Sequence, residues 1–311
     1  MQSLLPTFLK PSFLKLSFLK PSFLKKGPLI DENNADFIFA TVAWVLQNFD
    51  HDEFFNRTRL VAPSNEFFPG RVNSVDEKAQ NIFQHTLRYT GLRHWPFELK
   101  SMIERATNSE CQVQPMPQAE LALIKRDSFP QVPAPNEQAN KSANKQTEQE
   151  NKQGINEYGK PVPVIKTAQP LFVFYDPQQT LKPEDLSASF AHIIAQHVII
   201  QSGLAPVGGQ QFFAEASEVL ASMMGFGVLL TNSAYTFRGG CGSCYNAMAN
   251  RQPALTELDS VFTLALFCQL KGIGFKEATR DLKKHLRGSY KRAVTQIDQR
   301  LEQMESLRML V

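Results

Sequence analysis

The sequence predicts an α+β fold with a helical N-terminal part, a small β-sheet and a mainly helical C-terminal part. Helix-like stretches come early in the chain, short apolar segments typical of strands lie in its middle, and most of the chain after Pro183 has a helical pattern. The chain has 311 residues and a hydrophobic fraction of 42%, enough for one sizeable core. We therefore expect one folded domain, interrupted by a long polar segment.

Residues 1–30 form a basic, repetitive arm. Between residues 7 and 25 the motif Ser/Thr-Phe-Leu-Lys recurs every five residues, a period that fits neither a helix stripe nor a strand face. Pro11 and Pro21 interrupt any long helix, and the recurring Lys breaks up the apolar core that a secretory signal needs. We expect a disordered arm. A cationic arm that contacts anionic lipid or nucleic acid is the alternative.

The part from residue 31 to 130 contains predicted helices, a loop and a strand. The helices have apolar stripes, and the loop between them is bounded by prolines. In the second helix, Ile82, Phe83 and Leu87 share the apolar face. The predicted elements are the helices 35–50 and 76–89, the loop 61–69 and the strand 120–124.

Residues 131–160 are rich in Gln, Asn, Lys, Glu and Pro, with almost no large apolar side chain. Such a segment cannot bury enough apolar surface to offset its ordering entropy, so we expect a disordered insertion. The apolar segments 162–165 and 171–175 follow it and predict strands of the same sheet as residues 120–124.

The C-terminal part, residues 161–311, becomes helical at Pro183. Pro183, Glu184 and Asp185 suit a first helical turn, because proline needs no amide partner there and acids favour the positive helix end. Gly225 and Gly227 lie in a dense apolar run that predicts a buried helix, where they permit close helix contact at some cost in helix propensity. The predicted helices are 183–203, 211–230, 257–271 and 276–304, the last with a break at Gly288.

Charge and cysteine content narrow the function classes. The net charge is +3; outside the arm, 28 basic residues face 30 acidic ones, which does not suggest a dedicated nucleic-acid binder. No run of 18 or more apolar residues predicts a membrane span. The cysteines fit a reducing compartment better than a disulfide framework, so we expect a cytoplasmic protein. They are Cys111, Cys241, Cys244 and Cys268.

A degenerate metal-binding motif lies in the helix that begins at Pro183. A zinc-peptidase helix has the pattern His-Glu-x-x-His, in which two histidines face one metal and the Glu activates its bound water. Here His192 is the first His, but Ile193 occupies the general-base position and Gln196 the position of the second His. Ile193 cannot accept a proton, so the motif supplies no catalytic base.

Further candidate ligands lie nearby in the sequence. Glu215 and Glu218 fall on the next predicted helix, in the order that a helix-loop-helix metal site requires. His197 could replace the missing His, but it lies five residues after His192, about 140° away around the helix. The candidate metal ligands are therefore His192, His197, Glu215 and Glu218, with zinc or no metal at all as the cofactor; the alternative is that both histidines are ordinary helix residues.

Two stretches resemble a family of uncharacterised bacterial proteins with a zincin-like metallopeptidase helix. They are Arg59-Leu60-Val61-Ala62-Pro63-Ser64-Asn65-Glu66-Phe67-Phe68-Pro69, and the region from Leu186 through His192, Glu215 and Glu218 to residues 225–234 (GFGVLLTNSA). The resemblance covers roughly residues 35–130 and 160–295. It implies one zincin-like domain formed by residues 31–130 and 161–311, with His192 and Glu215 or Glu218 as metal ligands. The sequence departs from the family at Ile193 and Gln196.

Two other features are candidates for function. Cys241 and Cys244 form a Cys-x-x-Cys pair in a Gly-rich turn; we favour plain loop thiols over a metal site, and a metal site over a redox pair. The segment from Lys276 to Arg292 contains seven Lys or Arg residues. We interpret it as a solvated helix surface; a phosphate-binding patch is the alternative.

Taken together, the sequence predicts a pseudo-metallopeptidase, catalytically inactive, that acts by binding a partner such as another protein. The alternatives are a metal-dependent hydrolase with an altered ligand set, using His192, His197 and Glu215, and an interaction protein whose basic surfaces contact an anionic partner.

Overall fold

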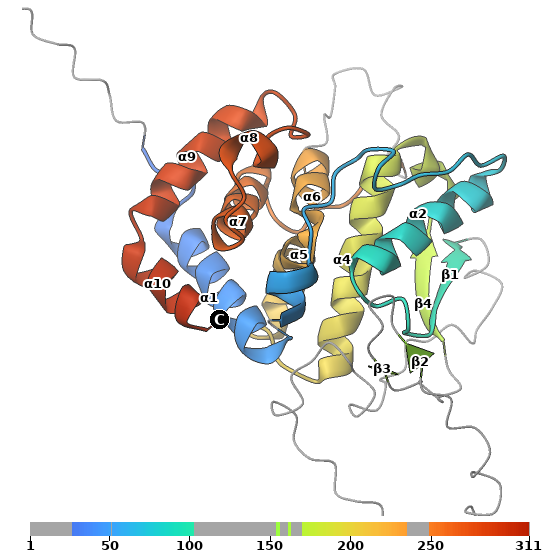
Figure 1. Ribbon diagram of the computed structural model, residues 1–311, viewed down its shortest axis with the longest axis horizontal. Coiled ribbons are helices and arrows are strands. Elements are labelled where there is room, and N and C mark those ends of the chain that lie inside the picture. Colours follow the sequence, from blue (N-terminus) through green and yellow to red (C-terminus); the bar gives the residue numbers. More distant parts are fainter. Residues whose placement is uncertain are drawn as a thin grey trace, which may run out of the picture.

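The computed structural model describes residues 27–50, 52–102, 154–155, 161–162, 170–234 and 249–310, and these have the expected α+β architecture (Figure 1). The α-helices are α1 (Glu32–Asn48), α2 (Val75–Tyr89), α4 (Pro183–Ser202), α5 (Phe213–Ala221), α6 (Gly227–Ser233), α7 (Glu257–Leu270), α8 (Phe275–Ala278), α9 (Leu286–Asp298) and α10 (Leu301–Met309). The strands are β1 (Phe97–Ser101), β2 (Gly154–Ile155), β3 (Pro161–Val162) and β4 (Leu171–Tyr175). The short 3₁₀ or π-helical turns are η1 (Glu53–Arg57), η4 (Pro177–Leu181), η5 (Gln210–Phe212) and η6 (Ser222–Phe226).

Helix α4 runs through the centre of the molecule, with α2 and β4 on one side and α5 and α6 on the other (Figure 1). It begins with Pro183 in its first turn beside Glu184 and Asp185, as predicted, and ends at Gly203, whose φ of 65° is a conformation that glycine adopts freely. Most of its residues are buried, because it is covered on both sides. The degenerate motif therefore lies on a core helix.

The sheet is formed by β1 and β4, which pair in parallel, with Phe97 opposite Leu171 and Ser101 opposite Tyr175. Alternate residues of β4 are buried, as expected of a strand with one face on the core. β1 was not among the predicted strands, and the predicted strand 120–124 lies outside the described residues. Of the predicted insertion, residues 154–155 are described; they pair as β2 with the antiparallel β3.

The predicted helix 211–230 is not continuous. The π-helical turn η6 separates α5 from α6, and Gly225 within it has a φ of 98°. A Cβ atom at this position would lie 2.1 Å from the carbonyl oxygen of Arg59. The Gly225 carbonyl in turn accepts a hydrogen bond from the amide of Val61 at 2.9 Å. The loop before α2 therefore crosses the helix at a point where only glycine fits.

The predicted break at Gly288 is wrong, because Gly288 lies inside α9. The chain instead leaves the helix between α8 and α9, where Asn232 donates a side-chain hydrogen bond to the Asp281 carbonyl at 3.0 Å and accepts one from the Lys283 amide at 3.0 Å. A second break separates α9 from α10 at Arg300, which pairs with Glu32 and Asp36 of α1. Both breaks coincide with contacts to segments that are distant in sequence.

One helical run of the described residues, Gln210–Ser233, has the length and composition of a membrane span, with a mean hydropathy of 1.4. However, 78% of its most apolar window is buried inside the protein. A core helix meets the same criteria, so this run is weak evidence for a membrane.

Candidate functional site

His192 is buried between α4 and α5. Its Nε2 atom lies 2.8 Å from the hydroxyl of Ser217 and 3.1 Å from the carbonyl oxygen of Ala214. Because a carbonyl oxygen only accepts hydrogen bonds, the second contact favours the tautomer that carries a proton on Nε2. In that tautomer Nε2 donates within the protein and has no lone pair for a metal.

Gln196 lies one helical turn after His192. Its side-chain nitrogen is 3.5 Å from His192 Nε2, so the two positions that hold the histidines of a zinc-peptidase helix do meet on one face of α4. Ile193, at the position of the general base, is a partly buried hydrocarbon side chain that packs against the hydrophobic core. The adjacency of residues 192 and 196 is that of any α-helix, and neither Ile193 nor Gln196 supplies the chemistry of a zinc-peptidase motif.

Glu218 is completely buried in an ion pair with Arg251. The Arg251 guanidinium lies 2.7 Å from one carboxylate oxygen, and the other oxygen accepts hydrogen bonds from the amides of Ala254 at 2.6 Å and Leu255 at 3.3 Å. Burial alone would raise the pKa of Glu218, but Arg251 and the Ala254 amide outweigh it and hold this pKa below its ordinary value. Both oxygens of this predicted ligand are therefore engaged inside the protein.

Arg251 belongs to the candidate site, and the sequence did not indicate it. Its side chain, 2% exposed, also donates to the Ser233 hydroxyl at 3.0 Å and to the Leu230 carbonyl at 3.3 Å. It lies between the Gly-rich stretch 239–242 and Pro253, with no helical or strand periodicity to suggest burial. Only the folded chain brings it to Glu218.

Glu215 lies on α5 one helical turn from the Glu218 pair. Its Oε2 atom is enclosed and has no hydrogen-bond partner among the described residues. The pKa of His192 is affected by three nearby charges, those of Glu215, Glu218 and Arg251. Burial nevertheless dominates and lowers the pKa of His192, and the Arg251 charge adds to this lowering, so the imidazole is neutral at pH 7.

His197 lies outside this cluster. Its Nε2 atom is 3.1 Å from the carbonyl oxygen of Phe172 on β4, and its ring packs edge-on against Phe97 of β1 at a centroid distance of 5.5 Å. Burial lowers its pKa. His197 thus ties α4 to the sheet, and the structure does not bring it together with His192.

Within the described part of the chain, no three His, Cys, Asp or Glu side chains are grouped so that they could hold a metal ion. The four predicted ligands therefore occupy different environments. His192 is bonded to α5, Glu218 to Arg251 and His197 to β4, whereas Glu215 keeps an unbonded oxygen.

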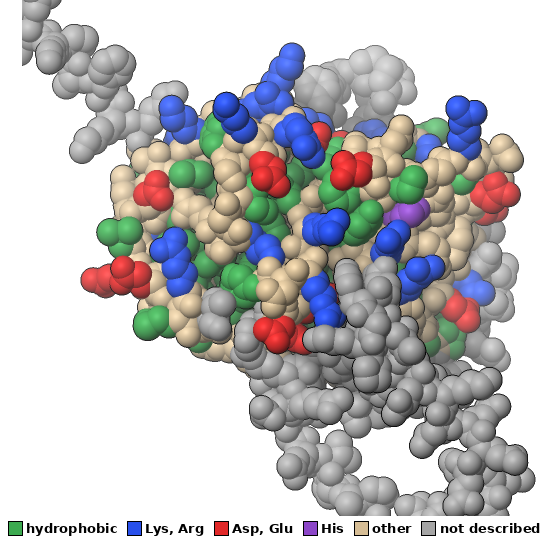
Figure 2. Space-filling model, viewed as in Figure 1, with side chains coloured by type: hydrophobic (Ala, Val, Ile, Leu, Met, Phe, Trp, Pro, Cys, Tyr) green, Lys and Arg blue, Asp and Glu red, His purple; other side chains and the backbone are tan. Residues whose placement is uncertain are grey.

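Among the other candidates, Cys241 and Cys244 lie outside the described residues. Cys268 is buried in α7, where burial raises the pKa of its thiol to about 12. In the basic C-terminal segment, several cations have partners inside the chain: Arg280 pairs with Asp281, Lys283 donates to Asn232, and Arg292 donates to the Gly27 and Pro28 carbonyls. Figure 2 shows Lys and Arg side chains along the upper edge of the molecule, over α8 and α9, with acidic side chains close by.

Comparison with known proteins adds no assignment, since no protein-family model, no curated protein and no solved structure matches this chain.

Proposed function

We propose that this protein is a pseudo-metallopeptidase: it carries a degenerate zinc-peptidase helix, does not hydrolyse its ligand, and acts by binding. The observation that carries the proposal is the state of the two best-placed ligands. His192 Nε2 and both oxygens of Glu218 are already bonded to protein groups.

The charge arrangement supports this proposal. A zinc site balances its carboxylate with a divalent cation, whereas here the guanidinium of Arg251 balances Glu218. Arg251 also keeps an additional positive charge near His192, which disfavours the approach of a second cation.

The missing base is a second support. Metal-assisted hydrolysis needs a group that takes the proton of the attacking water, and Ile193 offers no such atom. The residue one position after His192 is therefore a hydrocarbon where the reaction needs a carboxylate.

The proposal is tested by rebuilding the motif. The double variant Ile193→Glu, Gln196→His supplies the base and the second imidazole, and the 3.5 Å contact of residue 196 with His192 places that imidazole beside the first. For the third ligand the variant relies on Glu215 of the adjoining helix α5, whose Oε2 atom has no hydrogen-bond partner among the described residues. We expect this variant to bind about one zinc per chain in competition with a fluorescent zinc chelator.

Two controls make the result specific. The same double variant with His192→Ala should lose the zinc, and Ile193→Glu alone should gain none, because the added Glu is a base and not a ligand. Absence of zinc binding in a folded double variant would count against a metallopeptidase-like scaffold. Zinc-dependent cleavage of a peptide library by the natural chain would contradict the proposed inactivity.

A further inference from the structure

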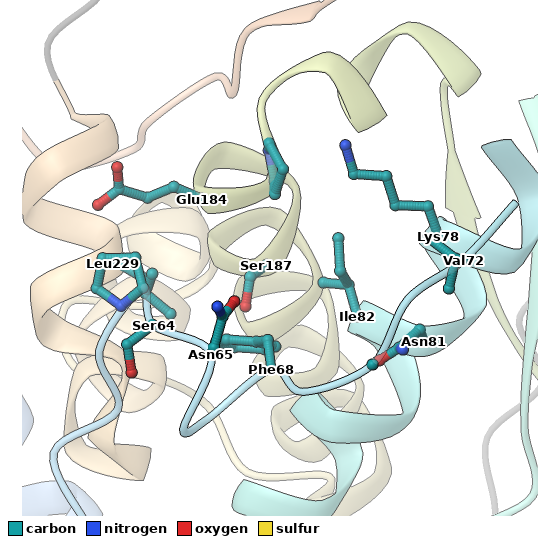
Figure 3. A pocket seen from close by; sticks show the side chains of 13 residues that line it. Ser64, Asn65, Phe68, Val72, Lys78, Asn81, Ile82, Glu184, Ser187 and Leu229 are labelled. Carbon is teal, nitrogen blue, oxygen red and sulfur yellow. The ribbon is translucent and has the colours of Figure 1, made fainter. Parts of the chain in front are cut away.

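A cavity of about 620 Å³ opens between the loop before α2, the α2 helix and the first turn of α4 (Figure 3). Sites for small molecules usually have volumes of roughly 300–1,000 Å³. The residues that line this cavity include none of His192, Glu215, Glu218 and Arg251, so it is separate from the degenerate motif.

The wall of the cavity is mainly apolar. Ile82 and Leu229 are buried side chains from α2 and α6, and Phe68 and Val72 from the loop are half-buried. Such a wall favours a ligand with an apolar body, because each apolar group removed from water contributes to binding.

Two residues of opposite charge line the cavity. Lys78 comes from α2, and its ammonium forms no ion pair with a described residue. Glu184 comes from α4 and is half-buried. In Figure 3 the two side chains lie on opposite sides of the first turn of α4. The cavity is therefore polarised, with a cation at one side and an anion at the other.

The Glu184 carboxylate is incompletely compensated. It accepts one hydrogen bond from Asn232 at 2.5 Å. Burial still raises the pKa of Glu184, despite this bond and the nearby Lys283. A positively charged group of a ligand would stabilise the ionised carboxylate.

Two amide side chains also line the cavity. Asn81 donates its side-chain N–H to the Pro69 carbonyl at 3.2 Å, which leaves its amide oxygen as an acceptor. Asn65 lines the cavity from an exposed position, and its amide points toward Ser187 of α4. Such groups suit a ligand that has a peptide unit between its charged ends.

We propose that this cavity binds a short apolar peptide with free ends, of dipeptide size, with its carboxylate at Lys78 and its ammonium at Glu184. The proposal does not depend on the fate of the metal motif, since the two sites share no lining residue.

The test uses the full chain, isothermal titration calorimetry, and three forms of the dipeptide Leu-Leu: the free dipeptide, the N-acetylated form and the C-terminal amide. Blocking either end should weaken binding to the natural chain about tenfold, the usual size of one lost charge-assisted hydrogen bond. Lys78→Met should weaken binding of the free dipeptide about tenfold and abolish the penalty for the C-terminal amide. Glu184→Gln, which keeps an acceptor for Asn232, should abolish the penalty for N-acetylation.

Lys291→Met is the matched control, because it removes the same charge from an exposed position on α9 that does not line the cavity, and it should bind as the natural chain does. Absence of binding of the free dipeptide would overturn the proposal. So would binding that is indifferent to the blocked ends, or a penalty that persists unchanged in Lys78→Met and Glu184→Gln, since either result would mean that these side chains do not recognise the ends of the peptide.

Discussion

Replacing Arg251 with Met tests whether this guanidinium balances the buried Glu218 charge. The variant loses the 2.7 Å ion pair and the hydrogen bonds to Ser233 and Leu230, and leaves a carboxylate that is fully enclosed. Removing one partner of a buried ion pair typically costs about 3–5 kcal/mol, because the remaining charge is left uncompensated. A loss of this size lowers the thermal midpoint by roughly 6–20 °C in a domain of this size.

The destabilisation caused by Arg251→Met should depend on pH. In the natural chain the pKa of Glu218 is below its ordinary value of 4.5, so its contribution is present above that pH and is lost as the pH falls through the lowered pKa. In Arg251→Met, the guanidinium no longer offsets the effect of burial, so burial raises the pKa of Glu218 and the folded state prefers the protonated acid. The difference in free energy of unfolding between variant and natural chain should therefore shrink from pH 7 to pH 5.

The assay is urea unfolding followed by circular dichroism at both pH values, with the double variant Arg251→Met, Glu218→Gln as control. The added Glu218→Gln substitution removes the buried charge and keeps an acceptor for the Ala254 and Leu255 amides. It should recover most of the lost stability at pH 7. A loss below about 1 kcal/mol in the single variant, or no recovery in the double variant, would refute the reasoning.

Three further predictions concern single residues. Gly225→Ala should lower the free energy of unfolding in urea by more than about 2 kcal/mol, because its Cβ would lie 2.1 Å from the Arg59 carbonyl oxygen and its φ is positive. The control Gly288→Ala, inside α9 with open space around it, should stabilise the protein by about 0.5–1 kcal/mol. Equal effects of the two substitutions would contradict the described kink. Because burial lowers the pKa of His192, the unfolded state binds a proton at higher pH than the folded state does, so stability should fall as the pH drops below about 6.5. His192→Asn should reduce this fall. If the free energy of unfolding of the variant changes with pH between about 7.5 and 5.5 as that of the natural chain does, the result would argue against a buried neutral imidazole. In a variant whose other cysteines are serine, Cys268 should react with a thiol reagent only after unfolding, because its thiol is buried and burial raises its pKa; rapid labelling of the folded protein would contradict this burial.

Local patterns predicted the elements that depend on local chemistry. The first turn of α4 follows from Pro183, Glu184 and Asp185, and the apolar face of α2 follows from its periodicity. Such features are set by neighbours in the sequence, so periodicity and capping rules find them.

Features fixed by distant contacts were missed. β1 has no clear alternation of buried residues and becomes a strand by pairing with β4, which follows it by about 70 residues. The break before α9 depends on Asn232, and the kink at Gly225 depends on Arg59. Tertiary contacts override local propensity at these positions, and a single sequence does not report them.

The candidate site was likewise predicted only in part from the sequence. The motif positions His192, Ile193 and Gln196 were found from their spacing, and their adjacency in the helix follows from the helical repeat. The partners of His192 and Glu218 come from α5 and from Arg251, which no spacing rule connects to α4.

The most direct test of the proposed function is the metal content of the purified full chain by elemental mass spectrometry, measured beside His192→Ala. Since the best-placed ligands are bonded to protein groups, we expect well below one zinc per chain in both proteins. About one zinc per natural chain that disappears in His192→Ala would contradict the account, and would establish a metal site built on an altered ligand set.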